Sequence, residues 1–215
     1  MKISASIFAT NDRLLAYVSQ LKFAKVDYLH LDFFQNGTNK FRLEDINALD
    51  YLQIPYDVHL LYEDITRENI NLLNNSSSEI LSLQWENLRN VEETLKLMER
   101  FKGDIGFAVT PNTDLNGLCE YLPRLDHILV MCSEPGVSGA KFMENSYDFI
   151  RSIREKFPYI KINVDGGIDN IRCRKVLELG ASLVVSGSYL FNNRNDMRYA
   201  VTMLKHPNRN YIQED

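Results

Sequence analysis

The chain has 215 residues, of which 45% are hydrophobic and 25% are charged, the composition of a globular protein. Its length suffices for one large domain with a well-buried core or for two small domains. The formal net charge of -5 offers no basic surface to a phosphate backbone, which excludes nucleic acid as an expected partner.

Cysteine use and hydropathy indicate the compartment. The three cysteines are widely separated and form no CxxC pair, so they predict neither a disulfide framework nor a thiolate metal site and fit a reducing environment. The apolar part of the amino-terminal MKISASIFATNDR is too short for a signal peptide, and no run approaches the ~20 residues that span a bilayer. We therefore expect a mature, soluble, cytoplasmic protein without membrane contact.

Strand-like and helix-like segments alternate along the whole chain. The runs rich in β-branched and aromatic residues predict eight strands: ISASIF (3–8), YLHLDFF (28–34), YDVHLL (56–61), EILSLQ (79–84), DIGFAVT (104–110), HILVMC (127–132), KINVDG (161–166) and SLVVSGS (182–188). Apolar residues recur every three or four positions in the intervening segments, which include DRLLAYVSQLKF, RNVEETLKLMERF, SYDFIRSIREKF and IRCRKVLELG.

This alternation predicts a parallel sheet built from βα units. Eight units in a chain of this length fit a single (β/α)8 barrel, the TIM barrel, over residues 1–215, with its active site at the carboxyl ends of the strands. A doubly wound open sheet is the structural alternative, because the same alternation produces either fold.

Two histidines and two aspartates fall near the ends of three predicted strands. His30 and Asp32 are two residues apart, so their side chains leave the strand on the same face. Imidazole nitrogens and carboxylate oxygens can together hold one divalent cation, and His59 and Asp165 would complete such a set. A lone strand-end histidine is usually a hydrogen-bonded core residue, and a lone aspartate often caps the next helix. Four of them at corresponding strand ends favour a metal site.

Glycines in the last two βα loops indicate phosphate binding. Gly166 and Gly167 follow the seventh predicted strand, and Gly187 and Ser188 follow the eighth. Barrels commonly bind phosphate at these loops, where glycine lets backbone N–H groups approach the phosphate oxygens. The glycine-bearing loop EPGVSGAKF (134–142) is predicted to close over the same ligand as a lid.

Motifs in a fixed order carry a resemblance that runs through nearly the whole chain. They are ASI with Ser6, HLDFFQNG, DVHLL, VTPNT, VMCSEPGVSGAKF, VDGGI and GASLVVSGSYLF. In this order and spacing the chain resembles the ribulose-phosphate 3-epimerase family. The resemblance implies a ribulose-phosphate-binding type of (β/α)8 barrel that is assembled as a homo-oligomer.

The resemblance also implies an activity. The expected reaction is the inversion of carbon 3 of a ketose phosphate, either D-ribulose 5-phosphate and D-xylulose 5-phosphate or a related ketohexose or longer ketose phosphate. One divalent metal ion, zinc, iron, manganese or cobalt, would stabilise the enediolate, while one aspartate removes a proton and the other returns one to the opposite face.

Individual roles follow from positions that match the family motifs. His30, Asp32, His59 and Asp165 match the metal ligands, and Asp32 and Asp165 match the acid and base pair. The positions that match substrate and phosphate contacts are Ser6, His59, Met131, Gly139, Gly166, Gly167, Gly187 and Ser188.

The chain departs from the family pattern around these residues. Phe34 and Leu61 stand where the family has methionines, HLDFFQNG carries one extra residue, and the FVPN segment is absent. Cys132 replaces a threonine and Ala140 a glutamine. These departures favour a specialised paralogue with a substrate other than D-ribulose 5-phosphate.

Two rival functions remain open at this stage. One is another phosphate-binding barrel isomerase or lyase, although HLDFFQNG lacks the lysine of the DxKxxD run that decarboxylases of this group share. The other is a non-catalytic sugar-phosphate-binding barrel, which would be expected to have lost a base or a ligand.

Overall fold

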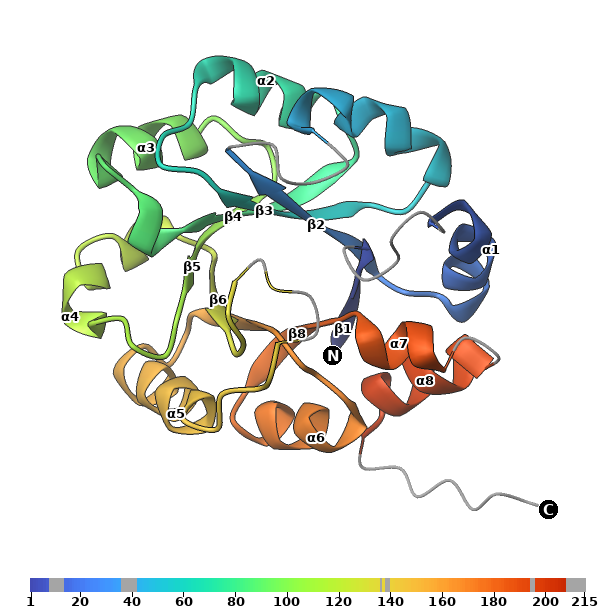
Figure 1. The fold of residues 1–215 in the computed structure, drawn as a ribbon. Helices are drawn as coiled ribbons and strands as arrows, with labels where there is room; N and C mark the ends of the chain where they lie inside the picture. Colours follow the sequence, from blue (N-terminus) through green and yellow to red (C-terminus); the bar gives the residue numbers. More distant parts are fainter. Residues whose placement is uncertain (8–13, 36–41, 136, 138–139, 194–195, 208–215) are drawn as a thin grey trace.

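The eight predicted strands form a closed parallel barrel in the computed structural model (Figure 1). The structure describes residues 1–7, 14–35, 42–135, 137, 140–193 and 196–207. Strand order around the barrel follows the sequence, and β1 pairs with β8 to close it. This closure confirms the (β/α)8 barrel and shows that the open-sheet alternative is wrong.

Each strand lies within two residues of its predicted bounds at either end. The strands are β1 (Lys2–Ser6), β2 (Tyr28–Phe34), β3 (Tyr56–Leu61), β4 (Ser78–Gln84), β5 (Asp104–Val109), β6 (His127–Met131), β7 (Lys161–Asp165) and β8 (Ala181–Ser186). The agreement arises because β-branched and aromatic residues cluster in runs that glycine, proline, asparagine and aspartate delimit.

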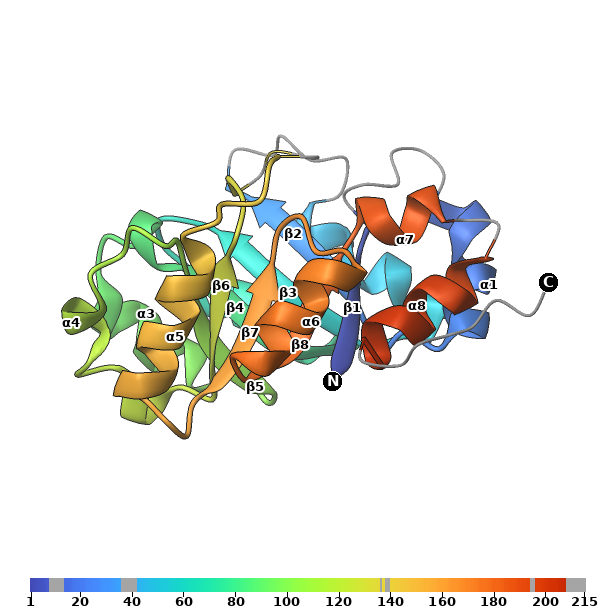
Figure 2. The same cartoon turned by 90° about the horizontal axis from the view of Figure 1, so that it is seen from below.

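Helices surround the barrel and connect its strands (Figures 1 and 2). The α-helices are α1 (Leu14–Ala24), α2 (Arg67–Asn74), α3 (Val91–Met98), α4 (Leu115–Leu118), α5 (Ser146–Lys156), α6 (Asn170–Glu178), α7 (Ser188–Asn192) and α8 (Met197–Lys205). Three 3-10 helices, η2 (Leu43–Leu52), η3 (Trp85–Asn87) and η4 (Leu122–Arg124), complete the described connections. No helix among these described residues has both the length and the apolar character that crossing a membrane requires.

Alternation along the strands divides the buried apolar residues into two clusters. The larger cluster lies between the strands and the helices, and includes Leu29, Phe107 and Val130. The smaller one consists of residues from the other face of the strands: Tyr28, Ile80, Ala108, Leu129, Met131, Leu183 and Val185. The inner face of the barrel is thus packed with side chains, and a ligand reaches only its end.

His127 occupies the inner face at the start of β6 and is fully buried. Its Nε2 lies 2.7 Å from the Ser82 hydroxyl oxygen. Gly106 makes room for the ring, because a Cβ on Gly106 would lie 2.5 Å from His127 Nε2. Burial lowers the pKa of His127 to about 4. The negative charge of Asp57 would raise this pKa, but burial outweighs it.

We expect His127 to make folding stability fall on acidification. Between its ordinary value of 6.5 and about 4, the unfolded chain binds a proton that the folded chain excludes, so the free energy of unfolding decreases as pH falls. The decrease from this residue is roughly 3 kcal/mol at most. Urea unfolding from neutral to acid pH should show a smaller decrease in His127→Gln than in the native chain. Equal decreases would contradict the assignment.

Candidate active site

Three of the four residues predicted as metal ligands, Asp32, His59 and Asp165, lie in the carboxyl-terminal halves of their strands, and His30 lies two positions before Asp32 on β2. Asp32 on β2 is the register partner of His59 on β3. Asp165 ends β7 and is the register partner of Met131 on β6. β2 and β7 are three steps apart around the barrel, with β1 and β8 between them. The two carboxylates therefore reach the site from separate sides of the ring.

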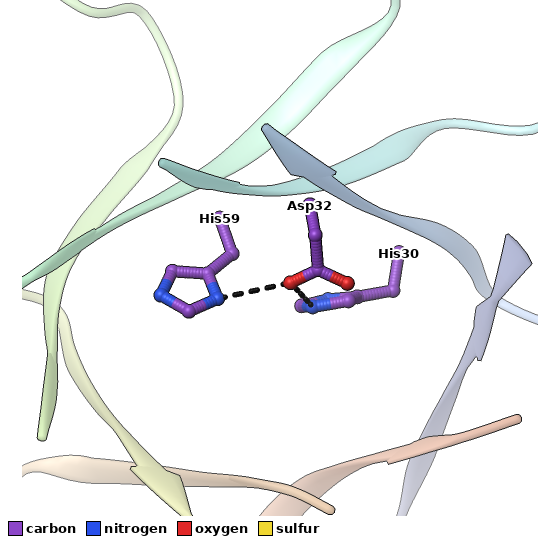
Figure 3. A group of neighbouring side chains, drawn as sticks. All are labelled: His30, Asp32 and His59. Atoms are coloured by element: carbon purple, nitrogen blue, oxygen red, sulfur yellow. Dashed lines mark hydrogen bonds and ion pairs between the residues drawn. The ribbon is translucent and has the colours of Figure 1, made fainter. Parts of the chain in front are cut away.

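His30, Asp32 and His59 converge on one point (Figure 3). Oδ1 of Asp32 lies 3.0 Å from His59 Nδ1 and 3.3 Å from His30 Nε2. Oδ2 of Asp165 lies 3.6 Å from the same His30 Nε2. Both histidine side chains are fully buried, whereas those of Asp32 and Asp165 are 11% and 15% exposed. The carboxylates alone therefore reach the solvent side of the cluster.

Asp57 on β3 fixes the orientation of the His30 ring. Its Oδ2 lies 2.8 Å from His30 Nδ1, and both side chains are buried. Because a carboxylate accepts hydrogen bonds, Nδ1 carries a proton and donates a hydrogen bond to Asp57. The lone pair of a neutral His30 then lies on Nε2, which faces Asp32 and Asp165.

Gln84 on β4 fixes the second ring in the same way. Its Oε1 lies 2.9 Å from His59 Nε2. An amide oxygen only accepts, so Nε2 carries the proton and Nδ1 of a neutral His59 holds the lone pair. That lone pair faces Asp32.

This donor set fits a divalent cation. Lone pairs of His30 and His59 face oxygens of Asp32 and Asp165, and two groups that only accept repel one another unless a proton or a metal ion lies between them. Both outer nitrogens of the rings are held by hydrogen bonds, as in most histidines that bind metal. Ligand atoms of His30, Asp32 and His59 lie within 4.8 Å of one another, close enough to share one ion, whereas Asp165 lies at the edge of this group. Two imidazoles and a carboxylate suit several divalent ions.

In the absence of a metal, the two aspartates hold protons differently. Burial would raise the pKa of Asp32, but the charge of His30 and hydrogen bonds from both histidines outweigh it and lower the pKa below its usual range. For Asp165, burial raises the pKa to about 6, and the charge of Asp32 acts in the same direction, although His30 opposes both. Without a metal ion, Asp32 is therefore ionised, whereas Asp165 keeps its proton to a higher pH.

His30 titrates in the direction expected between two acids. Burial alone would lower its pKa, but the charges of Asp32 and Asp57 outweigh burial and raise the pKa well above the ordinary value of 6.5. A proton thus occupies the cluster when no cation does.

A cavity of about 600 Å³ opens above this cluster. Most residues predicted to contact substrate line it, together with Asp32 and Asp165: Ser6, Met131, Gly166, Gly167, Gly187 and Ser188. His59 was predicted to contact substrate too, but it is buried and does not belong to the described wall of the cavity. Gly139 lies outside the described residues.

Backbone geometry explains one of the predicted glycines. Gly166 has a φ of +109°, and a Cβ there would lie 2.5 Å from the backbone nitrogen of Ser133. A side chain would therefore strain the backbone and collide with the residue after β6. Glycine brings the loops after β6 and β7 into contact beside the cavity.

The family departures lie differently around the cavity. Ala140 lines it, whereas Phe34 and Leu61 are not part of its described wall. Cys132 is fully buried, and burial raises the pKa of its thiol to about 12. Among these four departures from the family pattern, the one at Ala140 therefore alters the described cavity wall directly.

Several residues at the site were not predicted from the sequence. Asp57 and Gln84 hold the two histidine rings. Asp57 could have been inferred from strand alternation, since it shares the inward face of β3 with His59, whereas none of the four predicted ligands lies on β4 beside Gln84. Arg172 on α6 also lines the cavity, donates to the Gly167 carbonyl at 3.1 Å and pairs with Asp169 at 2.8 Å. No sequence pattern distinguishes this arginine from other exposed cations of the helix.

The closed barrel, with carboxylate and imidazole side chains beneath a cavity at the carboxyl ends of its strands, is the architecture of a (β/α)8 enzyme. The sequence profile of the ribulose-phosphate 3-epimerase family matches residues 2–191. The chain therefore belongs to this family and is an enzyme of the epimerase class.

Individual relatives agree with the family match. The chain is 30% identical over 208 residues to a ribulose-phosphate 3-epimerase of Buchnera aphidicola, and this match covers 90% of each chain. It is 32% identical over 146 residues to that of Aquifex aeolicus, and this match spans 66% of the chain and 65% of the relative. A solved phosphoribosyl anthranilate isomerase from Thermococcus kodakaraensis has a TM-score of 0.64 at 15% identity, covering 98% of this chain and 99% of that one. This structural likeness shows the fold alone.

Proposed function

We propose that this protein is a metal-dependent epimerase that inverts carbon 3 of a ketose phosphate by proton transfer between two carboxylates. The observation that carries the proposal is the convergence of Asp32 and Asp165, from separate sides of the barrel, on the same nitrogen of His30, at 3.3 and 3.6 Å. Inversion at one carbon requires a proton to leave one face and another to arrive on the opposite face, which two opposed carboxylates can provide.

The two carboxylates divide the proton transfer. Asp32 on β2 serves as the base that removes the carbon 3 proton from one face. Asp165 on β7, which reaches the site from a separate side of the barrel, serves as the acid that delivers a proton to the other face. The roles reverse in the opposite direction of the reaction.

His30, Asp32, His59 and Asp165 would hold the divalent ion. A bound ion supplies Lewis-acid chemistry, which lowers the energy of the negative charge that develops when the proton next to the ketone leaves. The chain itself contributes orientation, because Asp57 and Gln84 hold the histidine rings so that both lone pairs face the aspartates.

The end of the cavity at the loops after β7 and β8 is suited to the phosphate group. Gly166 and Gly167 after β7 and Gly187 and Ser188 after β8 line the cavity, as does Arg172. Backbone N–H groups of such loops bind phosphate oxygens, and the guanidinium adds positive charge nearby. We propose a sugar phosphate as the small-molecule partner, with the phosphate at this end and the reacting carbon above Asp32 and Asp165.

A panel of ketose phosphates tests the function. The metal-loaded protein should interconvert the carbon 3 epimers of at least one member of a panel of pentulose, hexulose and longer ketose phosphates, followed by NMR. Turnover of longer substrates in preference to D-ribulose 5-phosphate would support a specialised paralogue. Exclusive use of the pentulose phosphate would contradict the specialisation, and no epimerisation of any member would contradict the proposed function.

A further inference from the structure

A chain of hydrogen bonds extends from His59 away from the cavity to Glu86 in η3. Gln84 Oε1 lies 2.9 Å from His59 Nε2, and Gln84 Nε2 donates to Glu86 Oε2 at 2.5 Å. The other carboxylate oxygen, Oε1, accepts the backbone N–H of Thr110 at 2.8 Å and its hydroxyl at 3.0 Å. The hydroxyl of Thr113 donates to the same oxygen. Both oxygens of Glu86 are therefore engaged.

This chain of contacts has a fixed direction. An ionised carboxylate accepts hydrogen bonds and donates none, so the nitrogen end of the Gln84 amide must face Glu86. The oxygen end then faces His59, which must carry its proton on Nε2. The orientation that Glu86 imposes on the Gln84 amide thereby places the proton of His59 on Nε2.

We propose that Glu86 is a positioning residue that acts through Gln84 to hold His59 in the tautomer that has a proton on Nε2, which leaves Nδ1 as the nitrogen available to a cation beside Asp32. The consequence for metal binding rests on the metal centre of the proposed function, whereas the proton on Nε2 is a property of the metal-free protein. Glu86 is an exposed residue at the outer end of the contact chain, so its role is to orient the amide, with little contribution to the core.

For the isosteric variant Glu86→Gln, we can predict how the Gln84 amide and the His59 proton rearrange. The backbone N–H of Thr110 can only donate, so the amide oxygen of the new side chain takes the position of Oε1. Its NH2 group then faces the NH2 group of Gln84, and two donors cannot bond. Rotation of the Gln84 amide removes this conflict, but it turns the Gln84 NH2 toward His59 Nε2. Nε2 must then lose its proton to accept from this NH2 group, so the proton of His59 lies on Nδ1, the nitrogen that a cation needs.

The tautomer is measured directly by long-range ¹H–¹⁵N correlation of the His59 ring in the metal-free full-length protein, which shows whether Nε2 carries a proton. We expect a protonated Nε2 in the native chain and a bare Nε2 in Glu86→Gln. Zn²⁺ affinity, measured by competition with a chromophoric chelator, should fall on the order of 10- to 100-fold, as for other hydrogen-bond partners of metal ligands. Glu92→Gln, which neutralises an exposed glutamate of α3, is the matched control and should retain the native tautomer and affinity.

The outcomes separate this inference from the proposed function. An unchanged tautomer in Glu86→Gln, with circular dichroism showing a native fold, would overturn the role of Glu86 even if Zn²⁺ binds tightly. A native chain that takes up no Zn²⁺ would overturn the metal centre, while the tautomers of the metal-free proteins would still decide the role of Glu86. Glu86→Ala provides a second variant: without a partner for the amide nitrogen, the His59 ring should show a mixture of tautomers, and a single native tautomer would count against the inference.

Discussion

Asp165→Asn should lower kcat/KM by roughly 10²- to 10⁴-fold, the usual contribution of a positioned acid or base. The amide cannot exchange a proton with carbon 3, while its size and shape preserve the end of β7. Because Asp165 Oδ2 lies 3.6 Å from His30 Nε2, at the edge of the cluster, we expect this variant to lose turnover more than Zn²⁺ binding.

Steady-state kinetics and Zn²⁺ titration of the same preparation test this expectation. Asp104→Asn is the matched control, because Asp104 lies at the start of β5 and pairs with Lys161 away from the cavity. It should retain native kinetics. Normal activity in Asp165→Asn would remove Asp165 from the acid and base pair.

Asp32→Asn should lower kcat/KM at least as much as Asp165→Asn does, by on the order of 10⁴-fold. One oxygen of Asp32 lies 3.0 Å from His59 Nδ1 and 3.3 Å from His30 Nε2, so the variant loses both the base and the charge that faces the two imidazole lone pairs. Zn²⁺ affinity should fall together with turnover, which distinguishes this variant from Asp165→Asn.

Metal titration and kinetics at saturating Zn²⁺ separate the two losses. If activity returned to the native value once Zn²⁺ is saturating, Asp32 would be a ligand only and another group would be the base. If turnover and affinity both remained native, Asp32 would have neither role.

The strands and their order were predictable because local chemistry determines them. Runs such as YLHLDFF and YDVHLL combine β-branched, aromatic and leucine residues, and turn-forming residues separate them from helical segments. Eight βα units in about 200 residues then leave the closed barrel as the compact solution. The loop over residues 134–142 was predicted as a lid, but residues 136, 138 and 139 lie outside those the structure describes.

The site was predictable only where a side chain has distinctive chemistry. His30, Asp32 and His59 stand out at strand ends, and the structure brings them within reach of one cation. Gln84 and Glu86 do not stand out, because amide and carboxylate side chains are common after strands and their role depends on which group each faces across β3, β4 and β5. Trp85 between them packs against Phe107, with ring centroids 5.2 Å apart.

Deuterium incorporation at early times tests the two-carboxylate mechanism most directly. Metal-loaded protein is mixed in deuterated water with one carbon 3 epimer of a ketose phosphate that it turns over, and both epimers are examined by NMR before equilibrium. Opposed carboxylates predict that the product carries deuterium at carbon 3 while the remaining substrate carries almost none, because the proton added on the second face comes from solvent. Equal deuterium in substrate and product from the start, or product formed without deuterium, would contradict proton transfer between Asp32 and Asp165.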